Sequence, residues 1–448
     1  MRLFLAVLIL IAAGASSASA APAVISGADP EAYTLDLDYS DRGAGALRGS
    51  ERIEFVNRGP AALERIWLRL WANGPDRCRP RRIGVRIEAP AQAGAERVRC
   101  TALEVRLATP LAPGATGAVS LRFTVRGRRE GDRFGRIGDT ALLGNVVPVL
   151  AVEDELGLHL DPYTHLGESF YSLSARWEAA LRLPARLRAA TTGSVRSEAV
   201  RGRRRTLRVG AAQARDFGLA IGRLRVTNTS VAGVRIRAFA PPGLGVTRSS
   251  LRVARRTVDA LGRRLSPYGA PELDLVLLDS GIGELVGMEY PEVVFAVPAP
   301  DVIAHEVAHQ WWYGLVGNDQ YREPWLDESF ASYAHERLHP RWNLCKPKRP
   351  YGQVQPRRRG VPLDSSMELF DRLSPFAVGE VVYLAGSCAL QRLERDIGRP
   401  RMTSFLRLLQ ARHRHGVMRK SDVLDAIAEV APDYDLDRWL RLAHLSRR

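Results

Sequence analysis

Residues 302–312 read VIAHEVAHQWW and contain the pattern H-E-x-x-H at residues 305–309. The apolar spacing predicts a helix over 301–313, on which His305 and His309 leave the same face and can bind one metal ion. Glu306 projects beside that face, where a carboxylate can act as a general base. The H-E-x-x-H pattern fixes only three positions, and such a pattern also occurs by chance in long chains. The alternative interpretation is a helix with two exposed histidines and no metal.

A third candidate ligand lies nineteen residues after His309, where residues 325–331 read WLDESFA and include Glu328. Two imidazoles and one carboxylate leave the fourth tetrahedral position of a zinc ion open for water, as catalytic zinc requires. A structural zinc site would fill that position with a fourth side chain. We therefore predict one Zn²⁺ held by His305, His309 and Glu328, with Glu306 taking a proton from the attacking water and passing it to the leaving amine.

The chain on either side of this motif divides into two kinds of pattern. From 32 to 226, short alternating stretches such as 52–56, 119–125 and 177–183 are separated by Gly, Pro, Asn and Asp, which predicts an antiparallel β-domain. After residues 241–243 (PPG), helical spacing dominates, apart from a buried strand at 273–278. The predicted helices are 247–265, 301–313, 328–338, 380–397, 402–414 and 420–430. We predict a multidomain α+β chain, with a β-domain at 21–232 and an α-rich catalytic domain at 233–448.

A short element upstream of the motif, residues 287–291 (GMEYP), extends the pattern. Together with His305, Glu306, His309 and Glu328, it resembles the aminopeptidase N-like zinc metallopeptidases of peptidase family M1, also called gluzincins. That family combines a saddle-shaped antiparallel N-terminal β-domain with a thermolysin-like catalytic domain. The resemblance covers nearly the whole chain after residue 20.

The resemblance implies an aminopeptidase that releases single residues from the N-termini of peptide substrates. It assigns Glu289 to binding of the substrate's free α-amine, which a carboxylate close to the metal can anchor. Gly287 and Met288 are implied to line an edge along which the substrate backbone pairs like an added strand. Tyr383 matches the family tyrosine that donates a hydrogen bond to the oxyanion, although Ala385 stands where the family usually has lysine.

Two other functions remain open at this stage. If Glu289 does not face the metal, the same centre would serve a zinc endopeptidase. A degenerate peptidase domain acting as a non-catalytic binding module is the alternative from another functional class, and such relatives lose metal ligands or the base, which this sequence keeps.

The first residues predict export. Arg2 precedes an apolar run at 3–13, and residues 18–20 (ASA) form a small-x-small cleavage site, so we expect a signal peptide at 1–20 and a secreted or otherwise extracytoplasmic protein. A retained N-terminal membrane anchor is the alternative. Because no later apolar run has membrane-spanning length, we expect no stable membrane insertion after cleavage.

Cysteine and charge content agree with this interpretation. Four cysteines suit an oxidising compartment, and proximity in sequence suggests Cys78–Cys100 and Cys345–Cys388 among three possible pairings. The net charge of +16 comes almost entirely from arginines spread along the chain. No zinc-finger, helix-turn-helix or RNA-binding signature accompanies them, so we predict peptide partners and no nucleic acid. The oligomeric state is left open.

Overall fold

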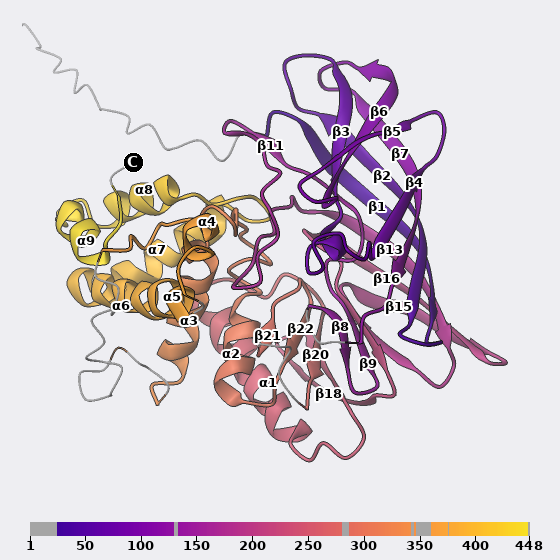
Figure 1. Ribbon diagram of the computed structural model, residues 1–448. Coiled ribbons are helices and arrows are strands. Elements are labelled where there is room, and N and C mark those ends of the chain that lie inside the picture. Colours follow the sequence, from indigo (N-terminus) through magenta and orange to yellow (C-terminus); the bar gives the residue numbers. More distant parts are fainter. Residues whose placement is uncertain are drawn as a thin grey trace, which may run out of the picture.

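The computed structural model describes residues 25–129, 133–279, 286–341, 345, 360–374 and 376–446. The predicted signal segment at 1–20 lies outside these residues. A β-rich N-terminal part and a helical C-terminal part lie side by side (Figure 1), as the two sequence patterns predicted. Within the described ranges, none of the helices combines the length and apolar character needed to cross a lipid bilayer.

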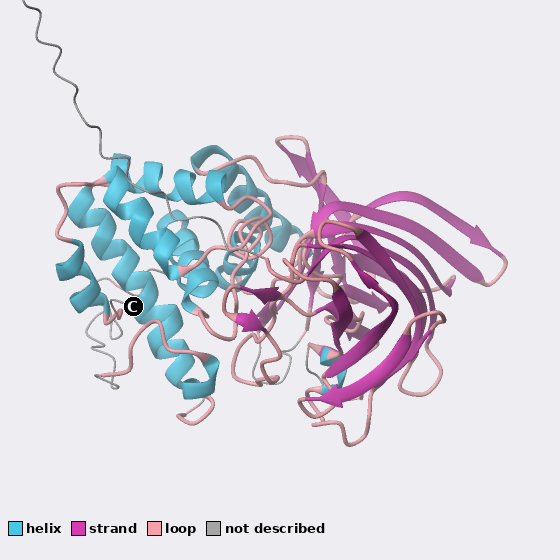
Figure 2. Cartoon of the chain, turned by 90° about the horizontal axis from the view of Figure 1, so that it is seen from above, coloured by secondary structure: helices cyan, strands magenta, loops and turns pink. Residues whose placement is uncertain are grey.

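The largest sheet of the N-terminal part has seven strands in the order β15-β16-β13-β1-β2-β7-β4, and Figure 2 shows it as strongly curved. All its pairings are antiparallel except β1 with β13, which is parallel. The stretches predicted at 52–56, 119–125 and 177–183 are strands. The bounds are β1 (Ala28–Ser40), β2 (Ala46–Asn57), β4 (Ile83–Ile87), β7 (Thr116–Arg126), β13 (Ala175–Pro184), β15 (Ser194–Arg201) and β16 (Arg204–Ala214).

Smaller sheets complete this part. One has the order β10-β3-β6-β5 and another β14-β17-β9-β8, and both contribute to the apolar core beneath the large sheet. A disulfide joins Cys78 to Cys100, as suggested by their proximity in sequence. The bounds are β3 (Leu63–Arg69), the 3₁₀ turn η1 (Trp71–Asn73), β5 (Gln92–Arg97), β6 (Ala102–Leu111), β8 (Phe134–Ile137), β9 (Thr140–Leu143), β10 (Val149–Leu150), the pair β11 (Glu153–Asp154) and β12 (Gly157–Leu158), β14 (Arg188–Thr191) and β17 (Leu219–Gly222).

A five-stranded sheet begins the C-terminal part, with the order β18-β19-β20-β22-β21. Every residue of β20 is buried, which confirms the buried strand predicted there. Strand β18 precedes residue 233 but pairs with β19 of this sheet, and β21 lies at its edge. The bounds are β18 (Arg225–Val231), β19 (Val234–Ala240), β20 (Glu272–Leu277), β21 (Gly287–Met288) and β22 (Val293–Ala296).

Helices pack against this sheet and against one another around a second large core that includes Trp311, Trp312 and Trp325. A disulfide between Cys345 and Cys388 ties α6 to the residues after α3. The helices are α1 (Thr247–Arg264), α2 (Pro300–Ala308), α3 (Trp325–Leu338), α4 (Met367–Phe370), α5 (Phe376–Val378), the π-helix η2 (Gly379–Ala385), α6 (Gly386–Ile397), α7 (Arg399–Arg412), α8 (Lys420–Val430) and α9 (Leu436–Ala443).

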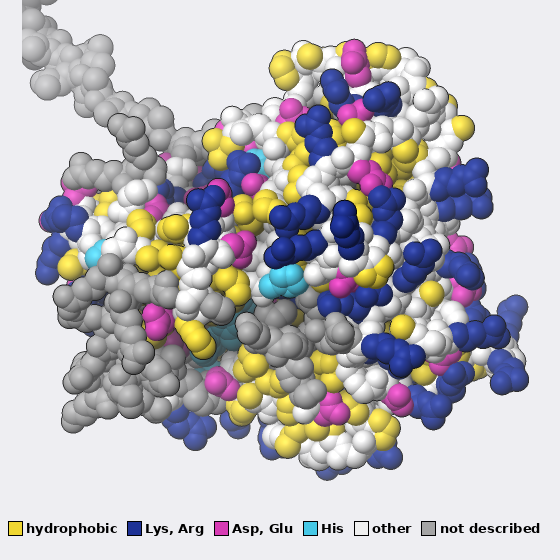
Figure 3. Space-filling view, in the orientation of Figure 1, with side chains coloured by type: hydrophobic (Ala, Val, Ile, Leu, Met, Phe, Trp, Pro, Cys, Tyr) yellow, Lys and Arg dark blue, Asp and Glu magenta, His cyan; other side chains and the backbone are white. Residues whose placement is uncertain are grey.

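Several helices differ from the prediction. Helices α3 and α7 begin three residues earlier than expected, and α4, α5 and α9 were not predicted. The motif helix ends at Ala308 instead of continuing to residue 313, and the helix predicted at 380–397 begins as the π-helix η2. Charged side chains are spread rather than gathered: on the face in Figure 3, Lys and Arg lie over the β-rich part with acidic side chains among them.

Candidate metal centre and active site

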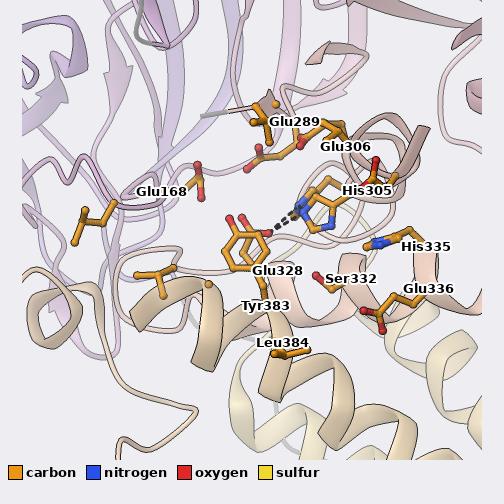
Figure 4. A pocket seen from close by; sticks show the side chains of 18 of the residues that line it. Glu168, Glu289, His305, Glu306, Glu328, Ser332, His335, Glu336, Tyr383 and Leu384 are labelled. Carbon is orange, nitrogen blue, oxygen red and sulfur yellow. Dashed lines mark hydrogen bonds and ion pairs between the residues drawn. The ribbon is translucent and has the colours of Figure 1, made fainter. Parts of the chain in front are cut away.

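The three predicted zinc ligands converge from two packed helices. His305 lies in α2, His309 directly follows the last residue of α2, and Glu328 lies in α3. Figure 4 shows the imidazole of His305 pointing at the carboxylate of Glu328. Glu328 Oε2 lies 3.0 Å from His305 Nε2 and 3.1 Å from His309 Nε2, and the two nitrogens are 3.0 Å apart. Zinc binds imidazole nitrogen and carboxylate oxygen at about 2.0–2.2 Å. Three donor atoms at these separations can therefore contact one ion.

The early end of α2 orients His309. Beyond Ala308 the chain turns, so that the carbonyl of Trp312 lies 2.9 Å from His309 Nδ1 and accepts a hydrogen bond from it. This hydrogen bond fixes the tautomer that leaves Nε2 free for a metal. Asp327 precedes the candidate ligand Glu328 in α3. It is buried and accepts hydrogen bonds from Asn318 and Gln320.

The carboxylate of Glu306 lies directly over the α-carbon of Gly287. A Cβ atom built on Gly287 would be 2.0 Å from Glu306 Oε1, so a glycine on strand β21 is required for this side chain to hold its place. Burial raises the pKa of Glu306 well above its ordinary value; the charge of His309 opposes the rise, and those of Glu328 and Glu168 add to it. A raised pKa makes this carboxylate a stronger proton acceptor, as its predicted role as general base needs.

Two further buried carboxylates face the metal centre. Glu289 follows β21, and Glu168 comes from the loop between β12 and β13. Oxygen atoms of Glu168, Glu289 and Glu328 lie within 4.8 Å of one another. Arg133 donates a hydrogen bond of 2.8 Å to Glu168.

Burial raises the pKa of Glu289 well above its ordinary range, and the charge of Glu168 adds to that effect. Burial also raises the pKa of Glu168, while the charge of Arg133 lowers it. A pocket with so many buried carboxylates binds cations well, because a bound cation offsets their mutual repulsion.

The sequence did not assign Glu168 a role. The residue lies far from the H-E-x-x-H motif in sequence, and the packing of the two parts of the fold brings it to Glu289.

The π-helix η2 carries Tyr383 to the metal centre. Its ring stacks on His305, with ring centroids 5.6 Å apart and 28° between the planes. Burial raises the pKa of Tyr383 well above its ordinary value, and the charge of Glu328 adds to that rise. The phenol therefore keeps its proton and can donate a hydrogen bond. Short π-helical segments are frequent at functional sites.

One cavity of about 980 Å³ joins these side chains. Gly287, Glu289, Glu306 and Tyr383 line it together with the three candidate ligands and Glu168. Ser332 and His335 line the same cavity one and two turns beyond Glu328 on α3. Met288 does not: its side chain is buried beneath the cavity with Tyr290 and Phe295, so only its backbone, on the edge strand β21, remains available to a ligand.

Comparisons with known proteins point to one family. Residues 290–441 match the model described as the peptidase family M1 domain. Human aminopeptidase RNPEPL1 is 26% identical over 253 residues, covering 46% of this chain and 33% of that protein. Human aminopeptidase B is 32% identical over 132 residues, covering 27% of this chain and 20% of that protein. The chain thus spans a third or less of the length of these curated relatives.

Solved structures extend the likeness to nearly the whole chain. An M1 zinc metallopeptidase from Deinococcus radiodurans has a TM-score of 0.67 at 22% identity, covering 94% of each chain. A mutant of that enzyme bound to a Tyr-Ser-Ala substrate matches with a TM-score of 0.67 at 20% identity, covering 94% of this chain and 95% of the other. At these identities the likeness shows the fold. The chain therefore carries a peptidase family M1 domain at residues 290–441 and has the fold of the M1 zinc metallopeptidases.

Proposed function

We propose that this protein is a zinc-dependent aminopeptidase that removes single residues from the N-termini of peptides. The observation that carries this proposal is the pair of buried carboxylates, Glu289 and Glu168, beside the three candidate zinc ligands in one cavity. Arg133 already pairs with Glu168, and a substrate's α-ammonium would supply a second positive charge beside Glu289. Support for peptide substrates comes from the relatives described as aminopeptidases and from the Deinococcus enzyme bound to a tripeptide.

The geometry supports a separate role for each of these side chains. Glu289 and Glu168 hold the ammonium and thereby set the cut one residue into the chain. Zinc, when held by His305, His309 and Glu328, supplies a Lewis acid that polarises the scissile carbonyl and lowers the pKa of water. Glu306 takes a proton from the attacking water and returns it to the leaving amine. Tyr383 donates a hydrogen bond to the oxygen on which negative charge develops.

Tripeptides with free and with acetylated N-termini test this proposal directly. Because acetylation removes the charge that two carboxylates would bind, we expect kcat/KM for Tyr-Ser-Ala to exceed that for its acetylated form by at least about 100-fold. The same comparison should be made on a panel of peptides that differ in their first residue, because the enzyme could accept tyrosine poorly at that position. Equal rates on the two forms would reject amine anchoring and favour a zinc endopeptidase.

We also propose that the protein is exported, with residues 1–20 acting as a cleaved signal peptide. The two disulfides support this proposal, since such bonds persist in oxidising compartments. N-terminal sequencing of the protein recovered outside the cytoplasm should begin at Ala21. Recovery in the membrane fraction with Met1 still present would favour a retained anchor.

A further inference from the structure

The three residues Asn318, Asp319 and Gln320 form a buried segment that lies between the β-rich part and the metal centre. The side chain of Gln320 has no solvent exposure. Its amide nitrogen donates one hydrogen bond of 3.1 Å to Glu289 Oε1 and another of 2.7 Å to Asp327 Oδ2. Because both acceptors are carboxylates, only the amide nitrogen can face them, and its two hydrogens are both used.

The same segment is held by the β-rich part. The backbone N–H of Gln320 donates to the carbonyl of Phe170 at 3.3 Å, two residues beyond Glu168. The neighbouring Asp319 lies 2.8 Å from His159 Nδ1 through its Oδ2. Gln320 is therefore fixed by the stretch that supplies Glu168 while it contacts Glu289. It links the two carboxylates that come from different parts of the fold.

We propose that Gln320 is a positioning residue for Glu289, holding this carboxylate in the orientation that binds the substrate's α-ammonium. This inference rests on the aminopeptidase function proposed above. The hydrogen bond engages Oε1 and leaves Oε2 for the ammonium. A neutral amide suits the task, because a lysine or arginine at this position would neutralise Glu289 and compete with the substrate for it.

The carbonyl oxygen of the Gln320 side chain also supports a functional role for this residue. Gln320 Oε1 is buried and has no hydrogen-bond partner among the described residues. A buried acceptor without a partner is costly, and few occur in native proteins. Gln320 has such an acceptor, although both hydrogens of the same amide donate to carboxylates at the site. We take this as a sign that the two donated hydrogen bonds matter for function.

Gln320→Met tests the role, since methionine has a similar length and lacks the donor. We expect the preference for free over N-acetylated Tyr-Ser-Ala to fall by about 10-fold, through a rise in KM for the free peptide. Gln410→Met is the matched control. Gln410 is also buried, and it donates a hydrogen bond of 2.8 Å to the carbonyl of Trp311. The control should lose comparable stability and keep the preference.

A double-mutant cycle separates positioning from general disruption. If Gln320 acts through Glu289, then Gln320→Met should change the preference by less than about 2-fold once Glu289→Gln is present. Two results would overturn this role and leave the aminopeptidase assignment intact. One is an unchanged preference in Gln320→Met, and the other is a double variant in which the two single losses of preference multiply. Equal rates of the unmodified enzyme on both peptides would overturn the two together.

Discussion

The phenol of Tyr383 lies beside the candidate metal ligands and lines the same cavity. Its ring packs on His305 through face contact that does not involve the hydroxyl. Tyr383→Phe therefore keeps the packing and removes the proposed hydrogen bond to the oxyanion. We expect kcat to fall by about 10²–10³-fold with little change in KM, since this bond forms mainly in the transition state.

Tyr333→Phe provides the control for that measurement. Tyr333 is buried on α3, and its hydroxyl donates to Glu394, away from the metal centre. This variant should lose a hydrogen bond and keep kcat. Steady-state kinetics on one peptide substrate compare the two, and a Tyr383→Phe enzyme with undiminished kcat would remove the phenol from the mechanism.

Single residues of the site could be predicted where their separation along the chain determines how close they lie in the fold. His305 and His309 lie one helical turn apart, so their common face follows from helix geometry. Glu168 and Gln320 carried no such signal. Each reaches Glu289 only through tertiary contacts, namely the packing of the two parts of the fold and the turn before α3, and nothing local in the sequence sets those distances.

At the level of elements, strand β21 approaches helix α2 closely at Gly287. Gly287→Ala would place a Cβ atom within 2.0 Å of Glu306 Oε1. The flexible end of Glu306 must then move, while the backbone can stay. We expect loss of about 100-fold in kcat/KM, because misplacing a reacting group by about 1 Å costs about that much, with thermal unfolding nearly unchanged.

Gly84→Ala is the corresponding control. Gly84 also lies in a strand, β4, and an added Cβ atom there meets nothing within 4 Å. Both variants should unfold cooperatively at temperatures close to that of the unmodified protein. Full activity of Gly287→Ala would mean that Glu306 does not need its observed position.

Element types were predicted more reliably than the details at their ends. The helices expected at 247–265 and 420–430 are found as α1 and α8 within one residue, because their apolar spacing is regular. The helix expected at 301–313 stops at Ala308, where backbone hydrogen bonds between residues 309–316 replace the helical ones. The apolar residues beyond that point, Trp311 and Trp312, pack into the core all the same, so composition could not reveal the turn.

At the scale of the whole molecule, a polar cluster joins the two parts of the fold. His159 from the β-rich part lies between two carboxylates, with Nε2 2.8 Å from Asp154 and Nδ1 2.8 Å from Asp319. Arg322 pairs with Asp161 and Asp319, and Arg419 pairs with Asp154. Donor atoms of His159, Asp161 and Asp319 lie within 4.8 Å of one another, but these contacts already balance their charges.

This cluster predicts a pH-dependent stability. Burial lowers the pKa of His159, but hydrogen bonds and charges from Asp154 and Asp319 outweigh burial and raise it to about 8. Since the folded value exceeds the ordinary value of about 6.5, the contribution is fully present below pH 6.5 and is lost as pH rises through 8. It amounts to about 2 kcal/mol. Denaturant unfolding between pH 6 and 9 should show this loss, and His159→Gln should abolish it. An identical pH dependence in both proteins would contradict the assignment.

The division into a β-rich and a helical part was readable from pattern alone, and the family domain and solved structures agree with it. The contacts between these two parts, and the pairing of strands within them, could not be predicted from the sequence pattern. The parallel pairing of β1 with β13 brings together strands that are distant in the chain, and alternation along a strand does not identify its neighbour. The cysteine pairs needed the structure to choose among three possibilities.

Zinc content per chain tests the central claim, that His305, His309 and Glu328 hold one ion for catalysis. After supply of zinc and removal of excess metal, elemental analysis should give one zinc in the unmodified protein. It should also give one in a Glu306→Gln variant that has lost turnover by about 10³-fold or more, and none in Glu328→Ala. A protein that stays free of zinc, or a Glu328→Ala variant that keeps its zinc, would contradict the account.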